Sequence, residues 1–71
     1  MNIWVSFRDE QGNVLGEWSD VPIPLVGNKV SITSSFKHLE GRVLCIDYSY
    51  NIKYYSGCCS VNITLTEVKT I

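Results

Sequence analysis

The sequence predicts an all-β fold: one small five-stranded barrel in which two hairpins flank a middle strand. Apolar and polar residues alternate through several short segments, and a period of two gives a strand one buried and one wet face. Turn residues separate these segments roughly every 8–12 residues, a spacing typical of sandwiches and barrels. The chain has only 71 residues, which makes it a single domain that buries roughly 60% of its unfolded surface.

The first hairpin is expected near the N-terminus. A strand is predicted over 2–8, where residues 3, 5 and 7 are apolar. Residues 9–13 contain Asp, Gly and Asn, which supply the chemistry of a tight turn. The second strand follows over 14–18. Gly16 lies inside it, and a glycine within a strand indicates a bulge or a close backbone approach.

The middle strand is expected after an irregular segment. Pro22 and Pro24 lack a backbone N–H and fix φ, so the chain there is extended and cannot pair regularly. Gly27 and the asparagine after it are a turn signal. Val30 and Ile32 then share one face, which predicts the third strand.

The last hairpin is predicted to pair strands over 42–53 and 60–69. A polar loop over 34–41, around Phe36 and Leu39, is expected to lead into it. This loop would place the only histidine of the chain, His38, at the surface.

The alternation also predicts which residues of the last hairpin face the core. In the fourth strand Leu44 and every second residue after it would point inward, and Val43 would point outward. In the fifth strand the apolar phase slips after Leu65, because the next apolar residue is Val68. A bulge or strand end near Thr66 and Glu67 would explain that slip. The inward residues predicted for the two strands are Leu44, Ile46, Tyr48, Tyr50, Ile52, Val61, Ile63 and Leu65.

Composition narrows the class of function. Charged residues make up 18% of the chain, below the ~25% of typical globular proteins. Either a partner covers part of the surface, or Ser, Thr and Asn take the place of charged groups. The net charge is −1 with a pI near 5.6, whereas proteins that bind nucleic acid usually carry a basic excess. Nucleic-acid binding is therefore disfavoured.

The cysteines indicate a reducing compartment. There are three of them, and an odd number in a chain that begins without a signal-peptide pattern favours the cytoplasm. Cys45 is expected to be a buried or half-buried strand residue. Cys58 and Cys59 are neighbours that point to opposite faces of a strand, so they do not readily pair with each other. No stretch approaches the ~18 apolar residues of a membrane span.

The sequence predicts no enzyme, no catalytic residue, no metal and no cofactor. One histidine in a loop supplies neither a nucleophile's base nor a metal-ligand set. The glycines lie singly and form no phosphate-binding loop. Asp47 lies in mid-strand, where it needs a partner if its face is covered and is ordinary if that face is wet. A barrel of this size is filled by its own side chains.

Aromatic residues are the best functional lead. Phe7, Tyr48 and Tyr50 fall on the apolar phase and are expected in the core. Trp4 falls on the polar phase, where it either plugs the curled sheet or offers contact area of the kind that dominates interfaces. The residues predicted to make interactions are Trp4, Arg8, Trp18, Lys53, Tyr54 and Tyr55.

The segment from Pro24 to Val30 carries a family resemblance. Its pattern of proline, valine, glycine, amide residue, any residue and valine resembles the opening of the middle strand in small Src-homology-type barrels. The layout of the whole chain is similar to that of short bacterial and bacteriophage barrel proteins. This resemblance implies a Src-homology-like barrel and a phage or mobile-element origin, and it carries no functional residues with it.

Together these observations predict a non-enzymatic protein-interaction module. It would be a phage or mobile-element accessory or inhibitor protein that docks on a host protein through an exposed strand edge, Trp4 and the hairpin over 54–59. The second or fifth strand would offer the unpaired edge, for strand addition by the partner or for self-association. One alternative is a barrel that binds single-stranded nucleic acid, with bases stacked on Trp4, Tyr54 and Tyr55 and phosphates held by three cations. A second is an oligomer that binds a small ligand or nucleotide between protomers. The three cations are Arg8, Arg42 and Lys53.

Overall fold

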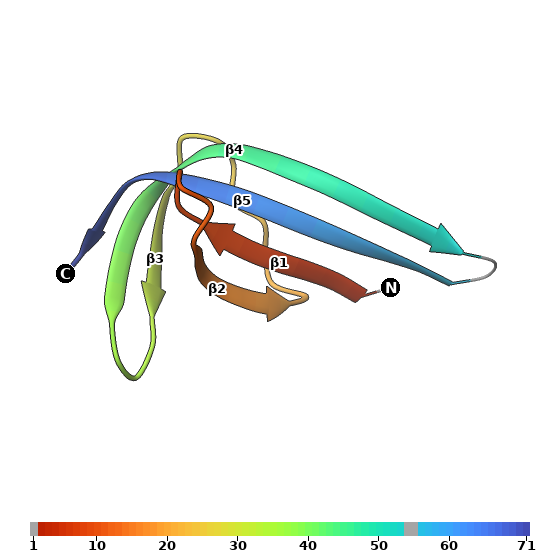
Figure 1. The fold of residues 1–71 in the computed structure, drawn as a ribbon, viewed down its shortest axis with the longest axis horizontal. Helices are drawn as coiled ribbons and strands as arrows, with labels where there is room; N and C mark the ends of the chain where they lie inside the picture. The colour runs from red at the N-terminus through yellow and green to blue at the C-terminus, as the bar shows by residue number, and fades with distance from the viewer. Residues whose placement is uncertain (1, 54–55) are drawn as a thin grey trace.

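A computed structural model describes residues 2–53 and 56–71, which form one five-stranded mixed sheet curled into a half-barrel (Figure 1). The predicted all-β class and five-stranded barrel architecture are confirmed. The strands are β1 (Asn2–Arg8), β2 (Val14–Ser19), β3 (Lys29–Thr33), β4 (His38–Lys53) and β5 (Ser56–Thr70).

The sheet has the order β2-β1-β5-β4-β3. The pairs are antiparallel except β1 and β5, which run parallel in register from Asn2 opposite Cys58 to Arg8 opposite Thr64. β5 therefore lies at the centre of the sheet. The expectation that the fifth strand offers an unpaired edge is wrong, whereas β2 does lie at an edge.

The core lies on the inner face of the curled sheet. Val5, Val61 and Ile63 are completely buried, and the register places Val5 opposite Val61. Val21 and Ile23, from the segment between β2 and β3, pack against this cluster. Burying each such aliphatic side chain contributes roughly 1.5–3 kcal/mol. The buried cluster consists of Val5, Phe7, Ile32, Leu39, Val43, Cys59, Val61, Ile63 and Leu65.

The predicted irregularity near Thr66 and Glu67 is confirmed. The register between β4 and β5 shifts where Arg42 faces Thr66 and Glu40 faces Lys69. Glu67 takes up the extra length with a φ of 54°, a left-handed conformation typical of a bulge.

A second bulge, at Leu44, was not expected. Val43 faces Leu65 and Cys45 faces Thr64, so Leu44 is the extra residue between them. The bulge reverses the inside-outside phase, leaving Val43 only 2% exposed and Leu44 47% exposed. The predicted inward Leu44 and outward Val43 are therefore wrong, and Cys45, expected to be at least half-buried, is exposed.

The last two strands are longer than predicted. β4 begins at His38 rather than at residue 42, so the expected loop over 34–41 shrinks to a tight turn. Leu39 is buried, and the carbonyl of His38 accepts a hydrogen bond from the backbone N–H of Ile71 at 2.8 Å. β5 begins at Ser56 rather than at residue 60. The two strands form a long hairpin that reaches well beyond the rest of the sheet (Figure 1).

At two positions the local structure requires glycine. A Cβ atom on Gly16 would lie 2.6 Å from the ring atom Cη2 of Trp18, which confirms the close approach predicted for this position. Gly27 has a φ of 91°, as the turn before β3 requires.

Candidate functional site

The longest unpaired backbone of the described chain lies along one edge of β4. The ladder with β3 ends where Lys29 faces Arg42. One further pair of hydrogen bonds, from Gly27 N to the Val43 carbonyl and from Val43 N to the Asn28 carbonyl, is 2.8 Å long in each case. From residue 44 to residue 53, β4 pairs only with β5 in the part of the chain that the structure describes. We call residues 44–53 the edge segment.

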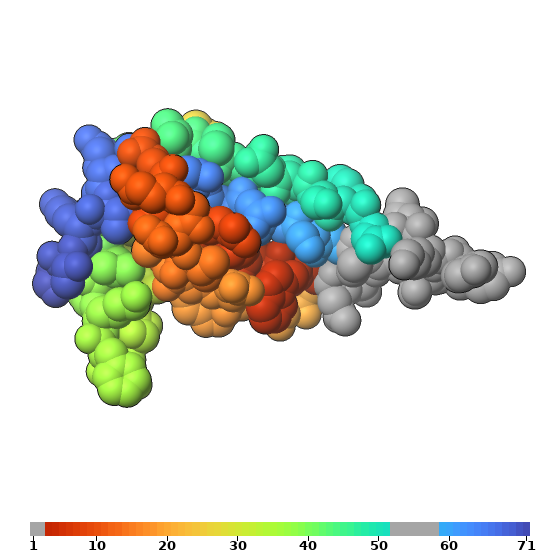
Figure 2. Space-filling model, viewed as in Figure 1, coloured from red at the N-terminus to blue at the C-terminus, as the bar shows by residue number. Residues whose placement is uncertain are grey.

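From residue 44 to residue 51 the edge segment runs along the upper border of the molecule in the view of Figure 2, where these residues are coloured green to teal. At ~3.3 Å per residue it extends for roughly 30 Å. The other two edge strands are short, with 6 residues in β2 and 5 in β3. The edge segment is thus the largest surface at which a further strand could be added.

The edge segment also has little of the protection that natural edges carry. Free edges are usually blunted by lysines, prolines or bulges. Between Leu44 and Ile52 the only charged residue is Asp47, and there is no proline. The bulge at Leu44 lies at the start of the segment, where it leaves the following residues regularly paired with β5.

Two stacked tyrosines lie beside this edge. Tyr48 faces Val61 and Tyr50 faces Cys59 across the ladder with β5, so both are on the inner face of the sheet. Their rings are 6.4 Å apart with an interplanar angle of 8°. Yet Tyr48 is 51% exposed and Tyr50 is 67% exposed. The expectation that they pack into the core is wrong. Both side chains are on the face of the sheet that forms the core, but no other part of the described chain covers them.

The two tryptophans lie on opposite faces of the sheet. Trp4, 48% exposed, is on the outer face, where its indole Nε1–H donates a 2.7 Å hydrogen bond to Oε2 of Glu17. Trp18 faces Val5 across the β1–β2 ladder and is therefore on the inner face. Its ring meets that of Phe7 edge-on, with centroids 5.8 Å apart. The tryptophans do not form one site.

The structure brings together only part of the predicted interaction set. Arg8 shares the outer face of β1 with Trp4, and its Nε–H lies 3.3 Å from Oγ of Ser6. Arg42 lies on β4 opposite Thr66 of β5, where its Nη1 donates to the carbonyl of Gly27. Lys53 is the last residue of β4. The Lys53 side chain and the predicted contacts of Tyr54 and Tyr55 lie outside the described residues.

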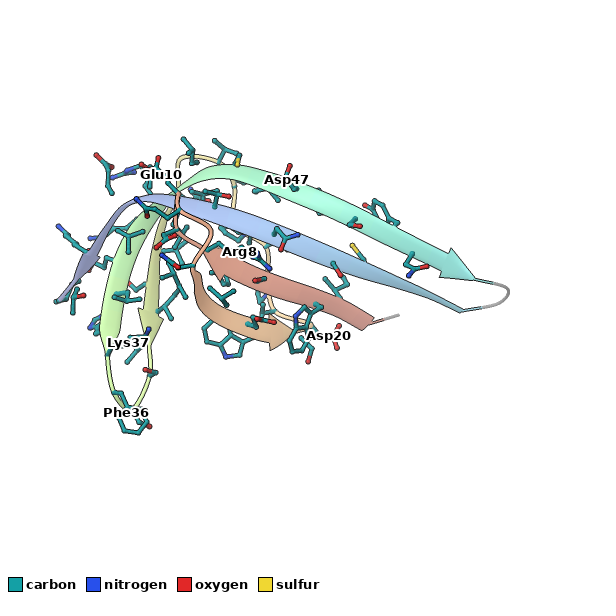
Figure 3. The ribbon with its side chains drawn as sticks, in the orientation of Figure 1. Arg8, Glu10, Asp20, Phe36, Lys37 and Asp47 are labelled. Carbon is teal, nitrogen blue, oxygen red and sulfur yellow. The ribbon has the colours of Figure 1, made fainter. Side chains whose placement is uncertain are left out.

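An exposed aromatic residue at the opposite end was not in the predicted set. Phe36 is 98% exposed at the tip of the turn between β3 and β4 (Figure 3). The hydroxyl of Ser34 accepts hydrogen bonds from the backbone N–H groups of Phe36 and Lys37 at 3.4 and 3.2 Å. Its polar neighbours in the sequence were a usable signal for this exposure. Tyr48 and Tyr50 had no such signal, because their phase is that of core residues.

A shallow hollow of about 260 Å³ lies among charged residues at the curled end of the sheet. Two of its three cations form ion pairs with its two acids: Lys29 Nζ lies 2.9 Å from Glu40, and Arg42 Nε lies 3.6 Å from Glu67. The hydrogen bond from Lys29 lowers the pKa of the Glu40 carboxyl. Both acids of the hollow neutralise a neighbouring cation, and of its cations only Lys69 is left without an ion pair among the described residues, so the hollow is a poor anion site. The residues that line it are Lys29, Glu40, Gly41, Arg42, Glu67 and Lys69.

The other polar candidates form no reactive cluster. Asp47 is exposed and points away from the sheet (Figure 3). Of the two alternatives for this residue, the one in which its face is open to solvent is therefore correct. In residues 2–53 and 56–71 there is no group of three His, Cys, Asp or Glu side chains placed to hold a metal ion. Nor does this part of the chain contain a helix long and apolar enough to cross a membrane.

Comparisons with known proteins identify no matching family model, no similar curated protein and no similar solved structure. The candidate site is therefore defined by its geometry alone. It consists of the edge segment of β4 and the tyrosine pair, Tyr48 and Tyr50, on the inner face beside it.

Proposed function

We propose that this protein is a non-enzymatic protein-interaction module that binds through the edge segment of β4 and the tyrosine pair. The observation that carries the proposal is an unpaired edge over residues 44–53 with one charged residue before Lys53. An exposed strand edge presents a row of N–H and C=O groups, and strand addition to such an edge is a common mode of protein recognition.

The tyrosine pair supports the same surface. Tyrosine offers a large contact area at a small cost in side-chain entropy, and tyrosines are enriched among the residues that dominate binding energy. Tyr48 and Tyr50 are at least half exposed and stacked on each other, so part of their ordering is complete before a partner arrives. Backbone pairing would supply affinity, and the rings would supply selectivity.

We place the module in the cytosol, as an accessory or inhibitor protein that acts by binding another protein. The free thiols of Cys45 and Cys59 suit a reducing compartment. The phage or mobile-element origin rests on the resemblance of the segment from Pro24 to Val30 to small Src-homology-type barrels.

Affinity capture with matched variants tests this proposal. Tyr48→Lys and Tyr50→Lys each place a positive charge beside the edge. Natural proteins use charged residues, lysine above all, to prevent strand addition at an edge. Phe36→Lys is the control, because it alters an even more exposed aromatic residue in the turn between β3 and β4, far from the edge segment. A protein retained by the wild type and by the control but lost by both tyrosine variants supports the proposal. If the tyrosine variants retain it fully, the edge segment is not the binding site.

Binding of single-stranded nucleic acid is a second candidate, favoured by Trp4 and Arg8 on one face of β1. Base stacking on an aromatic ring beside a cation is the usual physics of such binding. Fluorescence anisotropy with a labelled oligothymidine tests it at ~50 and ~200 mM salt, because phosphate contacts weaken steeply as salt rises. Binding that ignores salt, or that survives Trp4→Ala, would exclude this candidate.

A further inference from the structure

We infer that the partner of the edge segment is a second copy of this chain, with the two β4 strands paired antiparallel about a two-fold axis near Tyr48 and Ser49. The inference rests on the proposed function, since it names the occupant of the same site. It would join two half-barrels edge to edge and make one continuous sheet through both copies.

Symmetry restricts how two β4 strands can pair. An axis perpendicular to the sheet leaves every residue on its own face, so inner residues of one copy face inner residues of the other. In such a pair one residue of β4 lies directly opposite itself. An axis at Asp47 is unfavourable, because it sets two carboxylates opposite each other, and like charges in that position are destabilising.

The two positions after Asp47 give complementary pairs instead. With the axis at Tyr48, each Asp47 faces Ser49 of the second copy, a hydroxyl that can donate to the carboxylate. On the inner face Ile46 then faces Tyr50, and the two Tyr48 rings meet. With the axis at Ser49, Tyr48 of one copy faces Tyr50 of the other. In both registers the inner-face residues pair apolar with apolar. On the outer face the charged Asp47 lies opposite an uncharged residue.

The exposed rings suggest the strength of the contact. An aromatic side chain buries roughly 150–250 Å² in full, and Tyr48 and Tyr50 are 51% and 67% exposed. Covering both would remove roughly 200 Å² per copy from water, about a quarter of the roughly 800 Å² per partner in a standard interface. Backbone pairing along the edge must supply much of the rest, so we expect a reversible dimer. The net charge of −1 adds little repulsion between copies.

Sedimentation velocity over a wide range of protein concentration tests the inference on the whole chain. We expect the wild type to pass from monomer to dimer as concentration rises. Tyr48→Lys and Tyr50→Lys should weaken the dimer at least tenfold, whereas the control Phe36→Lys should leave it unchanged. Circular dichroism verifies that each variant folds. If a tyrosine variant fails to fold, Ser49→Lys takes its place, because Ser49 is at an exposed position on the outer face. It should weaken the dimer in the same way.

Disulfide trapping determines the register. In a Cys45→Ser background, a cysteine that lies opposite itself on the two-fold axis cross-links two copies under mild oxidation, because facing Cα atoms lie within disulfide reach. We expect trapping for Tyr48→Cys or Ser49→Cys, and none for the control Thr33→Cys on the edge strand β3. A dimer that traps at neither β4 position overturns the predicted pairing.

The outcomes separate this inference from the proposed function. A wild type that stays monomeric at all concentrations overturns the inference. If its tyrosine variants still lose a captured foreign protein, the proposed function stands. A dimer whose strength is unchanged by the tyrosine and Ser49 substitutions overturns the inference as well. The capture experiment then tests the proposed function independently.

Discussion

The unexpected bulge at Leu44 makes a sharp prediction about two leucines. Leu65→Ala should be strongly destabilising, whereas Leu44→Ala should be nearly tolerated. Leu65 is 1% exposed and faces the buried Val43, while Leu44 is 47% exposed as the extra residue of the bulge. Simple alternation through the two strands would place both leucines in the core and predict similar costs. The pair of variants therefore tests the bulge with the chemical change held constant.

The magnitudes follow from burial. A fully buried Leu→Ala change costs about 2–5 kcal/mol, because a cavity is added to the lost transfer energy. At Leu44 no closed cavity forms and roughly half the side chain is already wet, so we expect a loss below about 1 kcal/mol. A domain of this size is stable by only roughly 4–10 kcal/mol, at 0.05–0.15 kcal/mol per residue. Leu65→Ala should thus remove a large part of the total.

Urea unfolding followed by tryptophan fluorescence measures both variants. With a slope near the low end of the usual ~1–3 kcal/mol/M, Leu65→Ala should lower the midpoint by about 1 M or more. Leu44→Ala should shift it by clearly less. Each titration is run at two protein concentrations, since self-association would add stability at the higher one. Equal shifts for the two variants would refute the bulge and restore the simple alternation.

Three further predictions concern other parts of the fold. Gly16→Ala should lose about 1–3 kcal/mol by overpacking, because the new Cβ meets the Trp18 ring at 2.6 Å; a melting temperature equal to that of the wild type would contradict this contact. Phe36→Ala should change stability by less than about 0.5 kcal/mol, since the ring is 98% exposed, and thermal unfolding measures it. Lys29 lowers the pKa of Glu40 from its ordinary 4.5, so the stability that the Glu40 carboxylate contributes is present above pH ~4.5 and is lost as the pH falls through the lower folded-state pKa. Urea midpoints from pH 6 to pH 3 should therefore fall less for Glu40→Gln than for the wild type, and parallel curves would count against this ion pair.

The sequence predicted well whatever is local and periodic. The alternation that ends at Phe7 located β1, and the slip after Leu65 located the bulge at Glu67. Gly16 was predicted to mark a close approach, and the Trp18 ring covers it. In each case the signal and its physical cause lie within a few residues of each other along the chain.

Other features depend on neighbours that are distant in the chain. Leu44 follows Val43, and two adjacent apolar residues do not tell which of them faces the core. Gly41 was predicted to end the polar loop over 34–41, but it is buried in β4, where an added Cβ would lie 3.0 Å from Cβ of Leu65. The parallel pairing of β1 with β5 joins the two ends of the chain and has no local signature. That pairing moved the free edge from β5 to β4.

The candidate site was missed for the same reason. Period-two alternation assigns Tyr48 and Tyr50 to the correct face, and it cannot say how far the cover over that face extends. Conversely, Trp4 was correctly assigned to the polar phase, because its exposure requires only that the outer face be wet. A face can be predicted from the chain itself, whereas burial depends on what lies across from it.

One row of residues across the sheet shows how the free edge of β4 leaves Tyr48 exposed. Val5, Val61 and Tyr48 face one another in register on the inner face of β1, β5 and β4. Their exposed fractions are 0%, 0% and 51%. The change occurs between neighbouring strands of one row, so it reflects the end of the sheet rather than the orientation of the side chains. β5 is shielded by a strand on each side, and β4 beyond Val43 has β5 alone. A strand added at the edge segment would give Tyr48 the second neighbour that Val61 already has, and it would satisfy the free backbone groups of β4 in the same step.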